Sequence, residues 1–221
     1  MNENRKVLFL IGSPKKSRST SESMSDYLAE TIVKKVDWHI EKIHILSTIH
    51  ENPDRIAKAA IQSDLIVLAF PTYVDSLPSH VIRTLMLLET RLDNSKERDL
   101  MVLINCGFPE TFHNDNALKI CRFYAKQTGL NWRGGIAVGA GGAIIGKKLA
   151  ELGGMAGNLM KNIDLLTDRL IKDEMLQDDG ILRVQTVPTR MYNMAGNMGW
   201  KKQAQKYGVQ DRLYDKPDLK I

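Results

Sequence analysis

The chain has 221 residues, of which 43% are hydrophobic and 26% are charged. This is an ordinary globular composition, with enough length for one α/β domain and its core. The net charge is +5, but the lysines and arginines are spread along the chain, so we expect no nucleic-acid partner. No apolar run approaches the roughly 20 residues that span a bilayer, and the first apolar stretch is not a signal peptide. We therefore expect no membrane partner and a cytoplasmic location.

The cysteines and histidines predict neither a disulfide nor a metal site. Two cysteines, Cys106 and Cys121, are too few for a disulfide framework and are expected to be reduced. The five histidines form no compact ligand pattern with cysteines or carboxylates. The function is therefore expected to depend on other residue types.

The first two-thirds of the chain alternates between strand-like and helix-like segments. Most of the strand-like segments are nearly continuous in hydrophobic residues, as strands buried on both faces are, whereas residues 38–46 alternate and predict an edge strand. The predicted strands are residues 6–12, 38–46, 65–70, 100–105 and 132–138. The predicted helices are residues 19–36, 53–61, 79–92 and 116–128.

The C-terminal third has a different pattern. A long helical stretch with glycines inside it runs from about residue 146 to 174, and a short strand-like piece follows at residues 182–187. A last helix is predicted at residues 191–207, with methionines at helical spacing that favour core packing or a subunit contact. We expect residues 1–221 to form a single domain with a helical C-terminal extension from about residue 146.

Alternating strands and helices at this spacing predict a doubly wound five-stranded parallel sheet with helices on both faces. Right-handed crossovers leave few topologies for such a sheet. Ligands of these folds lie beyond the carboxyl ends of the strands. The loops that follow the predicted strands are therefore the places to look for a site.

The loop after the first predicted strand suits a phosphate. Of its ten residues, 12–21, five are Ser or Thr and three are Lys or Arg. The loop opens a helix, whose N-terminus offers free N–H groups and a partial positive charge. A capping box between Ser19 and Glu22 is compatible with this interpretation, and neither a Walker loop nor a G-x-G-x-x-G motif is present. A helix cap alone would not require the further hydroxyls of Ser13, Ser17, Thr20 and Ser21, which favour phosphate binding.

Two further loops suit a planar ring. Residues 71–78 combine an aromatic side chain and a hydroxyl with two prolines that stiffen the backbone. In residues 106–110, Gly107 permits a close approach of the backbone to a ring. A simple turn closed by Pro109 explains that loop equally well. The ends of the first, third and fourth predicted strands thus carry loops suited to a phosphate, a flat ring and a ring edge.

These loops resemble those of the NAD(P)H-dependent FMN reductases and quinone reductases, which are flavodoxin-like proteins. The G-S-P-[RK] motif of that group, followed by [SN]-T, is similar to Gly12-Ser13-Pro14-Lys15 and Ser19-Thr20. Its P-x-Y loop is similar to Pro71-Thr72-Tyr73, and its glycine loop to Cys106-Gly107-Phe108-Pro109. The resemblance covers about the first two-thirds of the chain, and the C-terminal third matches no motif of the group.

The resemblance implies an FMN-dependent oxidoreductase that takes hydride from NADH or NADPH and reduces a small acceptor such as a flavin or a quinone. It implies no catalytic side chain, because the flavin carries the chemistry, and it implies a homodimer. The implied residues at the FMN phosphate are Ser13, Lys15, Arg18, Ser19, Thr20 and Ser21. Those along the ribityl chain and ring are Pro71, Thr72, Tyr73 and Val74, and those at the pyrimidine edge are Cys106, Gly107 and Phe108.

Two other functions remain open. One is a non-catalytic electron carrier of the flavodoxin type, although such carriers are usually acidic and this chain is basic. The other is a Rossmann-like nucleotide-binding or phosphate-binding domain without a redox role. Flavin binding, and reduction of the bound flavin by a nicotinamide, distinguish the three.

Overall fold

A computed structural model describes residues 4–15, 17–93, 95–144, 147–176 and 178–216. The chain divides into two compact units, Met1–Thr186 and Val187–Ile221. The first unit contains the sheet and all the loops singled out above, and the second contains one long helix.

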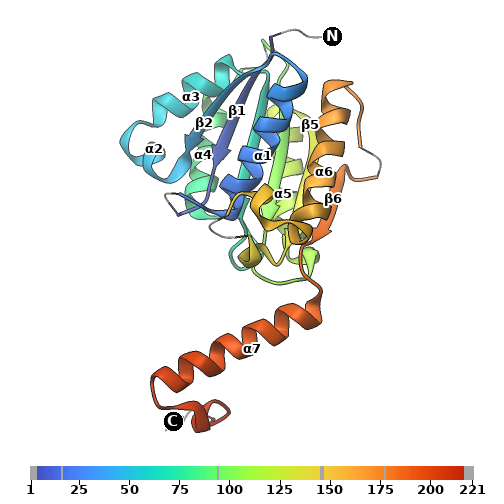
Figure 1. Ribbon diagram of the computed structural model, residues 1–221. Coiled ribbons are helices and arrows are strands. Elements are labelled where there is room, and N and C mark those ends of the chain that lie inside the picture. The colour runs from blue at the N-terminus through green and yellow to red at the C-terminus, as the bar shows by residue number, and fades with distance from the viewer. Residues whose placement is uncertain (1–3, 16, 94, 145–146, 177, 217–221) are drawn as a thin grey trace. The chain divides into compact units, whose positions relative to one another are not determined.

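The first unit is a parallel sheet of six strands with helices on both faces (Figure 1). Its strands are β1 (Lys6–Ile11), β2 (His39–His44), β3 (Leu65–Pro71), β4 (Asp99–Asn105), β5 (Asn131–Gly139) and β6 (Ile181–Gln185), in the order β2-β1-β3-β4-β5-β6. The parallel sheet covered on both faces is confirmed, but the prediction of five strands was wrong. The strand-like piece near residue 182 pairs with β5 as a sixth, edge strand. Only Val184 of β6 is buried, which explains its weak hydrophobic pattern.

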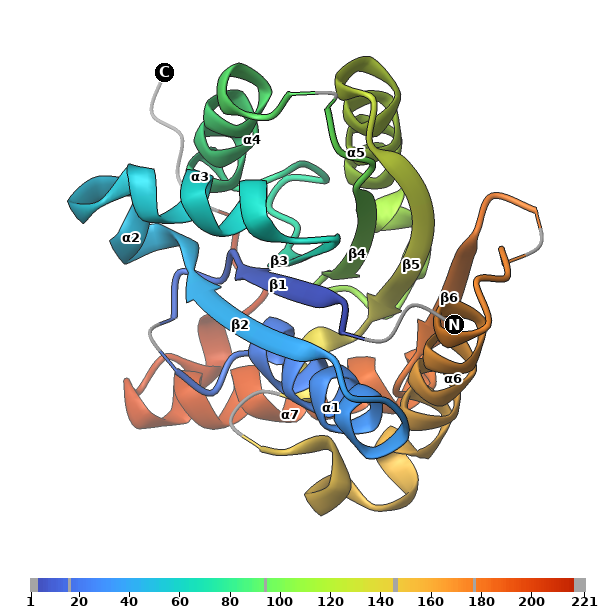
Figure 2. The ribbon, with the colours of Figure 1, turned by 90° about the horizontal axis from the view of Figure 1, so that it is seen from above.

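The helices form one layer on each face of the sheet (Figure 2). Helices α1 (Thr20–Lys35) and α6 (Gly154–Ile171) cover one face. The other face is covered by α2 (Ile45–Glu51), α3 (Pro53–Gln62), α4 (Ser79–Arg91) and α5 (Asp115–Thr128). Short 3-10 turns lie at Thr111–Asn114, Gly141–Ala143 and Leu149–Leu152. Helix α2 was not predicted, because its β-branched residues continue the strand-like pattern before it.

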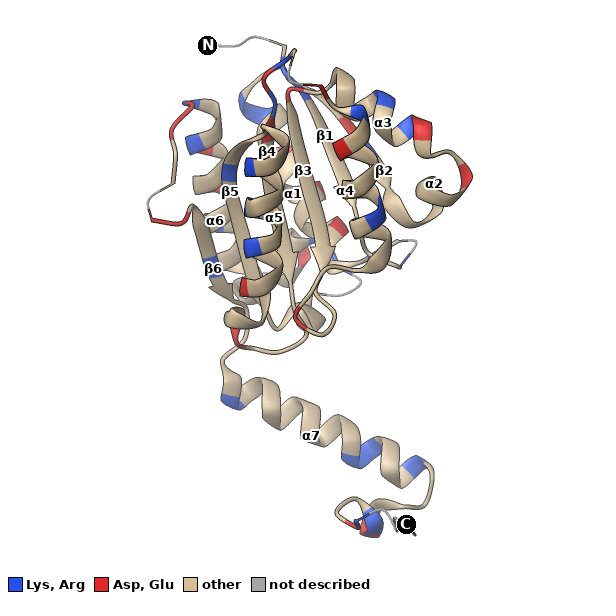
Figure 3. Ribbon diagram, turned by 180° about the vertical axis from the view of Figure 1, so that it is seen from behind, with Lys and Arg blue, Asp and Glu red and all other residues tan. Residues whose placement is uncertain are grey.

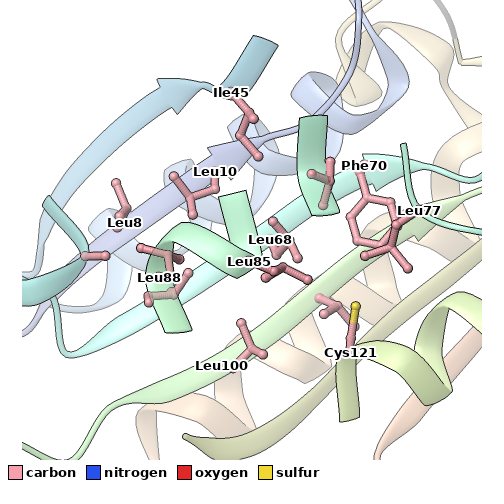
Figure 4. Close-up of a cluster of buried hydrophobic side chains, with 14 of the residues drawn as sticks. Leu8, Leu10, Ile45, Leu68, Phe70, Leu77, Leu85, Leu88, Leu100 and Cys121 are labelled. Atoms are coloured by element: carbon pink, nitrogen blue, oxygen red, sulfur yellow. The ribbon is translucent and has the colours of Figure 1, made fainter. Parts of the chain in front are cut away.

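The side chains of each central strand alternate between the two layers. Leu8 and Leu10 of β1 point into the cluster shared with α2–α5, whereas Val7 and Phe9 lie in the cluster shared with α1 and α6. Figure 4 shows the first of these clusters, in which Leu8 and Leu10 lie near side chains from α4, β3 and β4. Burial on both faces makes the strands a rigid platform, and their carboxyl ends hold the loops in fixed positions.

Charged residues of both signs occur on the same helices of the first unit (Figure 3). In the second unit, α7 (Thr189–Lys206) confirms the predicted last helix, and a short turn follows at Gln210–Arg212. Met191, Met194 and Met198 of α7 are exposed within this unit. Among the described residues, no helix has both the length and the apolar character needed to cross a membrane.

Candidate ligand site at the carboxyl ends of the strands

Four adjacent strands, β1, β3, β4 and β5, end at the same edge of the sheet. Backbone hydrogen bonds continue past the strand ends into the loops. The N–H of Gly12 donates to Ala69 O at 2.7 Å, and that of Thr72 donates to Asn105 O at 2.8 Å. The N–H of Cys106 donates to the carbonyl of residue 138 at 3.0 Å. Loops that are far apart in sequence therefore lie side by side.

The N-terminus of α1 provides free donors at this edge. Ser19 is the N-cap residue, and its Oγ accepts from the Glu22 N–H at 3.1 Å while the Glu22 carboxylate accepts from the Ser19 N–H at 3.4 Å. The capping box read from the sequence is thus present. The first N–H groups of a helix have no partner inside it, and those of Thr20 and Ser21 bond no other described residue. They are available to an anion.

The loop hydroxyls have partners within the protein. Thr20 Oγ1 donates to the Gly141 carbonyl at 2.7 Å, and Ser21 Oγ donates to Asn105 Oδ1 at 3.0 Å. Ser13 Oγ accepts from the Lys15 N–H at 3.3 Å. The bonds of Thr20 and Ser21 fasten α1 to the loop after β5 and to the end of β4. Among the described residues of this loop, the exposed ones are Pro14, Lys15, Ser17 and Arg18.

The loop after β3 is held in an unusual backbone conformation. Val74 and Asp75 both have positive φ, at 51° and 54°, although neither is glycine. A β-branched residue in this region is a genuine outlier, and such strain is common at ligand sites. The Val74 side chain is fully exposed, and two hydrogen bonds between Tyr73 and Ser76 close the turn. Partial burial raises the pKa of the Tyr73 hydroxyl above its usual value.

Pro71 and Thr72 attach this turn to the sheet. Pro71 is the last residue of β3, and its backbone pairs with Asn105 of β4. The Thr72 hydroxyl donates to Asn114 Oδ1 at 3.3 Å, and Asn114 is fully buried. Asn114 Nδ2 in turn donates to the carbonyl at the end of β5, at 3.2 Å. The buried side-chain amide of Asn114, in the turn after β4, thus connects the ends of β3 and β5.

The loop after β4 contains the buried Cys106 and the exposed Phe108. The Cys106 thiol donates to the Phe108 and Glu110 carbonyls at 3.3 and 3.4 Å. Burial raises the pKa of this thiol, which disfavours the thiolate form. A Cβ added at Gly107 would meet no atom within 4 Å, so the space beside it is open. A Cβ at Gly139 would lie 2.0 Å from the Pro109 carbonyl oxygen, so glycine is required there.

A pair of side chains that the sequence analysis did not single out joins the loop after β3 to the loop after β4. His113 Nδ1 lies 2.9 Å from Asp75 Oδ1, and the His113 ring stacks on Phe108 with centroids 4.5 Å apart. The two partners are 38 positions apart in sequence. No local spacing pattern marks such a pair, and only the fold brings it together.

A hollow of about 350 Å³ lies beside the N-terminus of α1. It is lined by Ser17, Arg18, Glu22, Ser23, Asp26, Lys147, Lys148 and Glu151. Neither Tyr73 nor Phe108 lines it. A phosphate at the α1 N-terminus would lie next to this hollow, whereas a ring would lie against the two other loops.

No family model matches the chain, and no curated protein matches it in sequence. Solved structures do match it. The FMN-dependent NADH-azoreductase from Bacillus anthracis in complex with FMN has a TM-score of 0.53 at 14% identity, covering 75% of this chain and 99% of that one. An oxidoreductase from Corynebacterium diphtheriae has a TM-score of 0.54 at 14% identity, covering 77% and 99%. The NAD(P)H:quinone oxidoreductase from Methanothermobacter marburgensis has a TM-score of 0.52 at 12% identity, covering 76% and 96%.

The chain has a flavodoxin-like fold. The predicted fold class is confirmed apart from the strand number. The structural neighbours of this flavodoxin-like chain include oxidoreductases of the kind that its loops resemble, among them azoreductases and a quinone oxidoreductase. At 10 to 14% sequence identity these matches show that the fold is shared and no more. The activity therefore has to be argued from the residues of the site.

Proposed function

We propose that the chain binds FMN at the carboxyl edge of its sheet and works as an NAD(P)H-dependent oxidoreductase for a small acceptor. The observation that carries this proposal is the convergence of a helix N-terminus with free N–H groups and two loops with exposed aromatic side chains. The fold of FMN-dependent and NAD(P)H-using proteins supports it.

The phosphate end of FMN fits the start of α1. The free N–H groups of Thr20 and Ser21 point out of the helix end, where the helix dipole favours an anion. Lys15 and Arg18 are exposed beside them. The hydroxyls of Thr20 and Ser21 hold the loop in place through Gly141 and Asn105. We therefore assign phosphate binding mainly to backbone N–H groups and cations.

The ring end of FMN fits the loops after β3 and β4. Tyr73 and Phe108 are each more than half exposed as whole residues, and exposed aromatic side chains offer flat apolar surfaces. The open space at Gly107 gives backbone groups access to a ring edge. Bound FMN would supply the hydride and electron chemistry. The chain's own residues bind it, orient it and exclude water.

Flavodoxin-type electron transfer without catalysis is the alternative, and the net charge of +5 argues against an acidic carrier surface. The small-molecule acceptor, the homodimer and the cytoplasmic location stay predictions. Gel filtration tests the dimer.

Parallel titrations of the purified chain with FMN and riboflavin, followed by flavin fluorescence, test the placement of the phosphate. Charge-assisted bonds to a phosphate should make FMN bind at least about tenfold more tightly than riboflavin, which corresponds to about 1.4 kcal/mol or more. Equal affinities would contradict a phosphate site at α1. Binding of neither flavin would contradict the proposed function.

A further inference from the structure

The outward surface of α5 carries an aromatic ring among positive charges. Lys119, Arg122, Phe123 and Lys126 follow the i, i+3, i+4, i+7 spacing that places side chains on one stripe of a helix. All four residues are exposed, whereas the buried residues of the same helix are apolar and uncharged. Figure 3 shows the Lys and Arg positions along α5. The helix thus has a second patterned face that the packing of the sheet does not use.

This stripe forms one wall of a hollow of about 520 Å³, here called the α5 hollow. Phe123 supplies part of its apolar lining, and the buried Leu130 and the half-buried Trp132 supply the rest, next to the start of β5. The Trp132 ring is held by a hydrogen bond from its Nε1 to the Asp179 carbonyl at 3.4 Å. A volume in the range of about 300–1,000 Å³, an apolar lining and a few polar groups are typical of a small-molecule pocket.

The cations of the α5 hollow are not neutralised by the protein. The side chains of Lys119, Arg122 and Lys126 form no ion pair or hydrogen bond with another described residue, and no Asp or Glu lines the hollow. Glu89 lines an adjoining hollow, which shares Lys119 and Phe123 with this one. Like charges one helical turn apart repel each other, so an anion bound here would relieve that repulsion.

The α5 hollow is separate from the proposed flavin site. α5 begins after the loop that follows β4, and it ends before the start of β5. Lys126, Leu130 and Trp132 therefore lie toward the amino ends of the parallel strands, whereas the flavin loops lie at the carboxyl ends. None of residues 12–21, 71–78 and 106–110 lines this hollow. A ligand in it would not compete with FMN.

We propose that the α5 hollow binds a small organic anion with an apolar body and a carboxylate, at a site distinct from the flavin. A carboxylate accepts two parallel hydrogen bonds from a guanidinium such as that of Arg122, and an apolar body packs against Phe123 and Trp132. A second copy of the chain suits this face less well. A two-fold contact brings the same patch together from both copies, so the unpaired cations of each would meet.

Isothermal titration calorimetry with decanoate and decylammonium tests the charge preference of the hollow. The two probes have alkyl chains of the same length and opposite charges near neutral pH. Three cations attract one head group and repel the other, so decanoate should bind at least about tenfold more tightly than decylammonium at low ionic strength. Saturating FMN should change the decanoate affinity by no more than about twofold, because the two sites share no residue.

Three variants locate the binding. Arg122→Glu should weaken decanoate binding by about tenfold or more, since an attraction becomes a repulsion. Phe123→Ala should weaken both probes by about threefold to tenfold, because it removes apolar contact area. Lys58→Glu is the matched control: it makes the same change of net charge at an exposed position of α3. Its decanoate affinity should stay within about twofold of wild type, because distant exposed charges are screened.

Equal affinities for the two probes, or an unchanged decanoate affinity in Arg122→Glu, would overturn this assignment. Competition between decanoate and FMN would place decanoate at the flavin site and overturn it as well. A wild-type dimer that dissociates in Phe123→Ala, measured by gel filtration, would show that a second copy covers this face. A hexaglutamate peptide that binds as tightly as decanoate would assign the face to an acidic protein segment instead. Failure of FMN to bind would contradict the proposed function and leave this assignment standing.

Discussion

Gly135→Ala is expected to destabilise the first unit by about 3 kcal/mol, the upper range for overpacking. β5 carries an irregularity at this point, because Leu100 pairs with Trp132 but Val102 pairs with Gly135. A Cβ at Gly135 would lie 1.9 Å from the Val102 carbonyl oxygen and 2.8 Å from its carbonyl carbon. The clash is with backbone rather than with the end of a flexible side chain. β4 and β5 would have to separate to relieve it.

Urea denaturation of the full chain, followed by far-UV circular dichroism, measures this loss. Gly157→Ala is the matched control: a Cβ there would meet nothing within 4 Å, and the residue lies inside α6. Alanine at a helix interior should stabilise by roughly 0.5–1 kcal/mol. An unfolding midpoint of Gly135→Ala equal to that of wild type would show that β4 and β5 are not paired in this register.

Arg18→Glu is expected to weaken FMN binding by about 10- to 100-fold, since reversing a charge near a phosphate is worth roughly 1–3 kcal/mol. Arg18 is exposed immediately before the N-cap residue of α1, and its φ of 56° turns the chain into the helix. The substitution changes the charge beside the free N–H groups from favourable to repulsive. Riboflavin, which lacks the phosphate, should bind the variant as it binds the wild type.

Arg122→Glu changes the net charge by the same amount on the exposed face of α5. Its FMN affinity should stay within about threefold of wild type, because long-range effects between exposed charges are screened at physiological salt. Fluorescence titrations at one fixed ionic strength compare the two variants. Equal FMN affinities in Arg18→Glu and wild type would place the phosphate elsewhere.

The framework of the fold could be predicted because burial leaves a local signal. β3 and β4 are buried throughout almost their whole length, and both contain a continuous apolar run, residues 65–70 in β3 and residues 100–104 in β4. β6 and α2 lack that signal. β6 buries one residue at the edge of the sheet, and the β-branched residues of α2 are helical because tertiary packing of Ile45 and Ile49 outweighs their propensity.

Contacts of the candidate site that lie within one loop could be predicted from the sequence, whereas contacts between two loops could not. Ser19 and Glu22 are three residues apart, so their capping box is visible in the sequence. The bonds from Thr72 to Asn114 and from Asp75 to His113 cross 42 and 38 positions. Such contacts exist only after the strands have aligned their ends. The sequence therefore indicated hydroxyls for a ligand, while the structure shows two of them, on Thr20 and Ser21, bonded to neighbouring loops.

The absorbance spectrum of the purified chain with added FMN, recorded anaerobically before and after NADH or NADPH, tests the central claim most directly. We expect the flavin to stay with the protein through gel filtration and its absorbance bands to bleach when the nicotinamide is added. Flavin that binds without bleaching would contradict the reductase and favour an electron carrier. A chain that retains no flavin would contradict the proposed site itself.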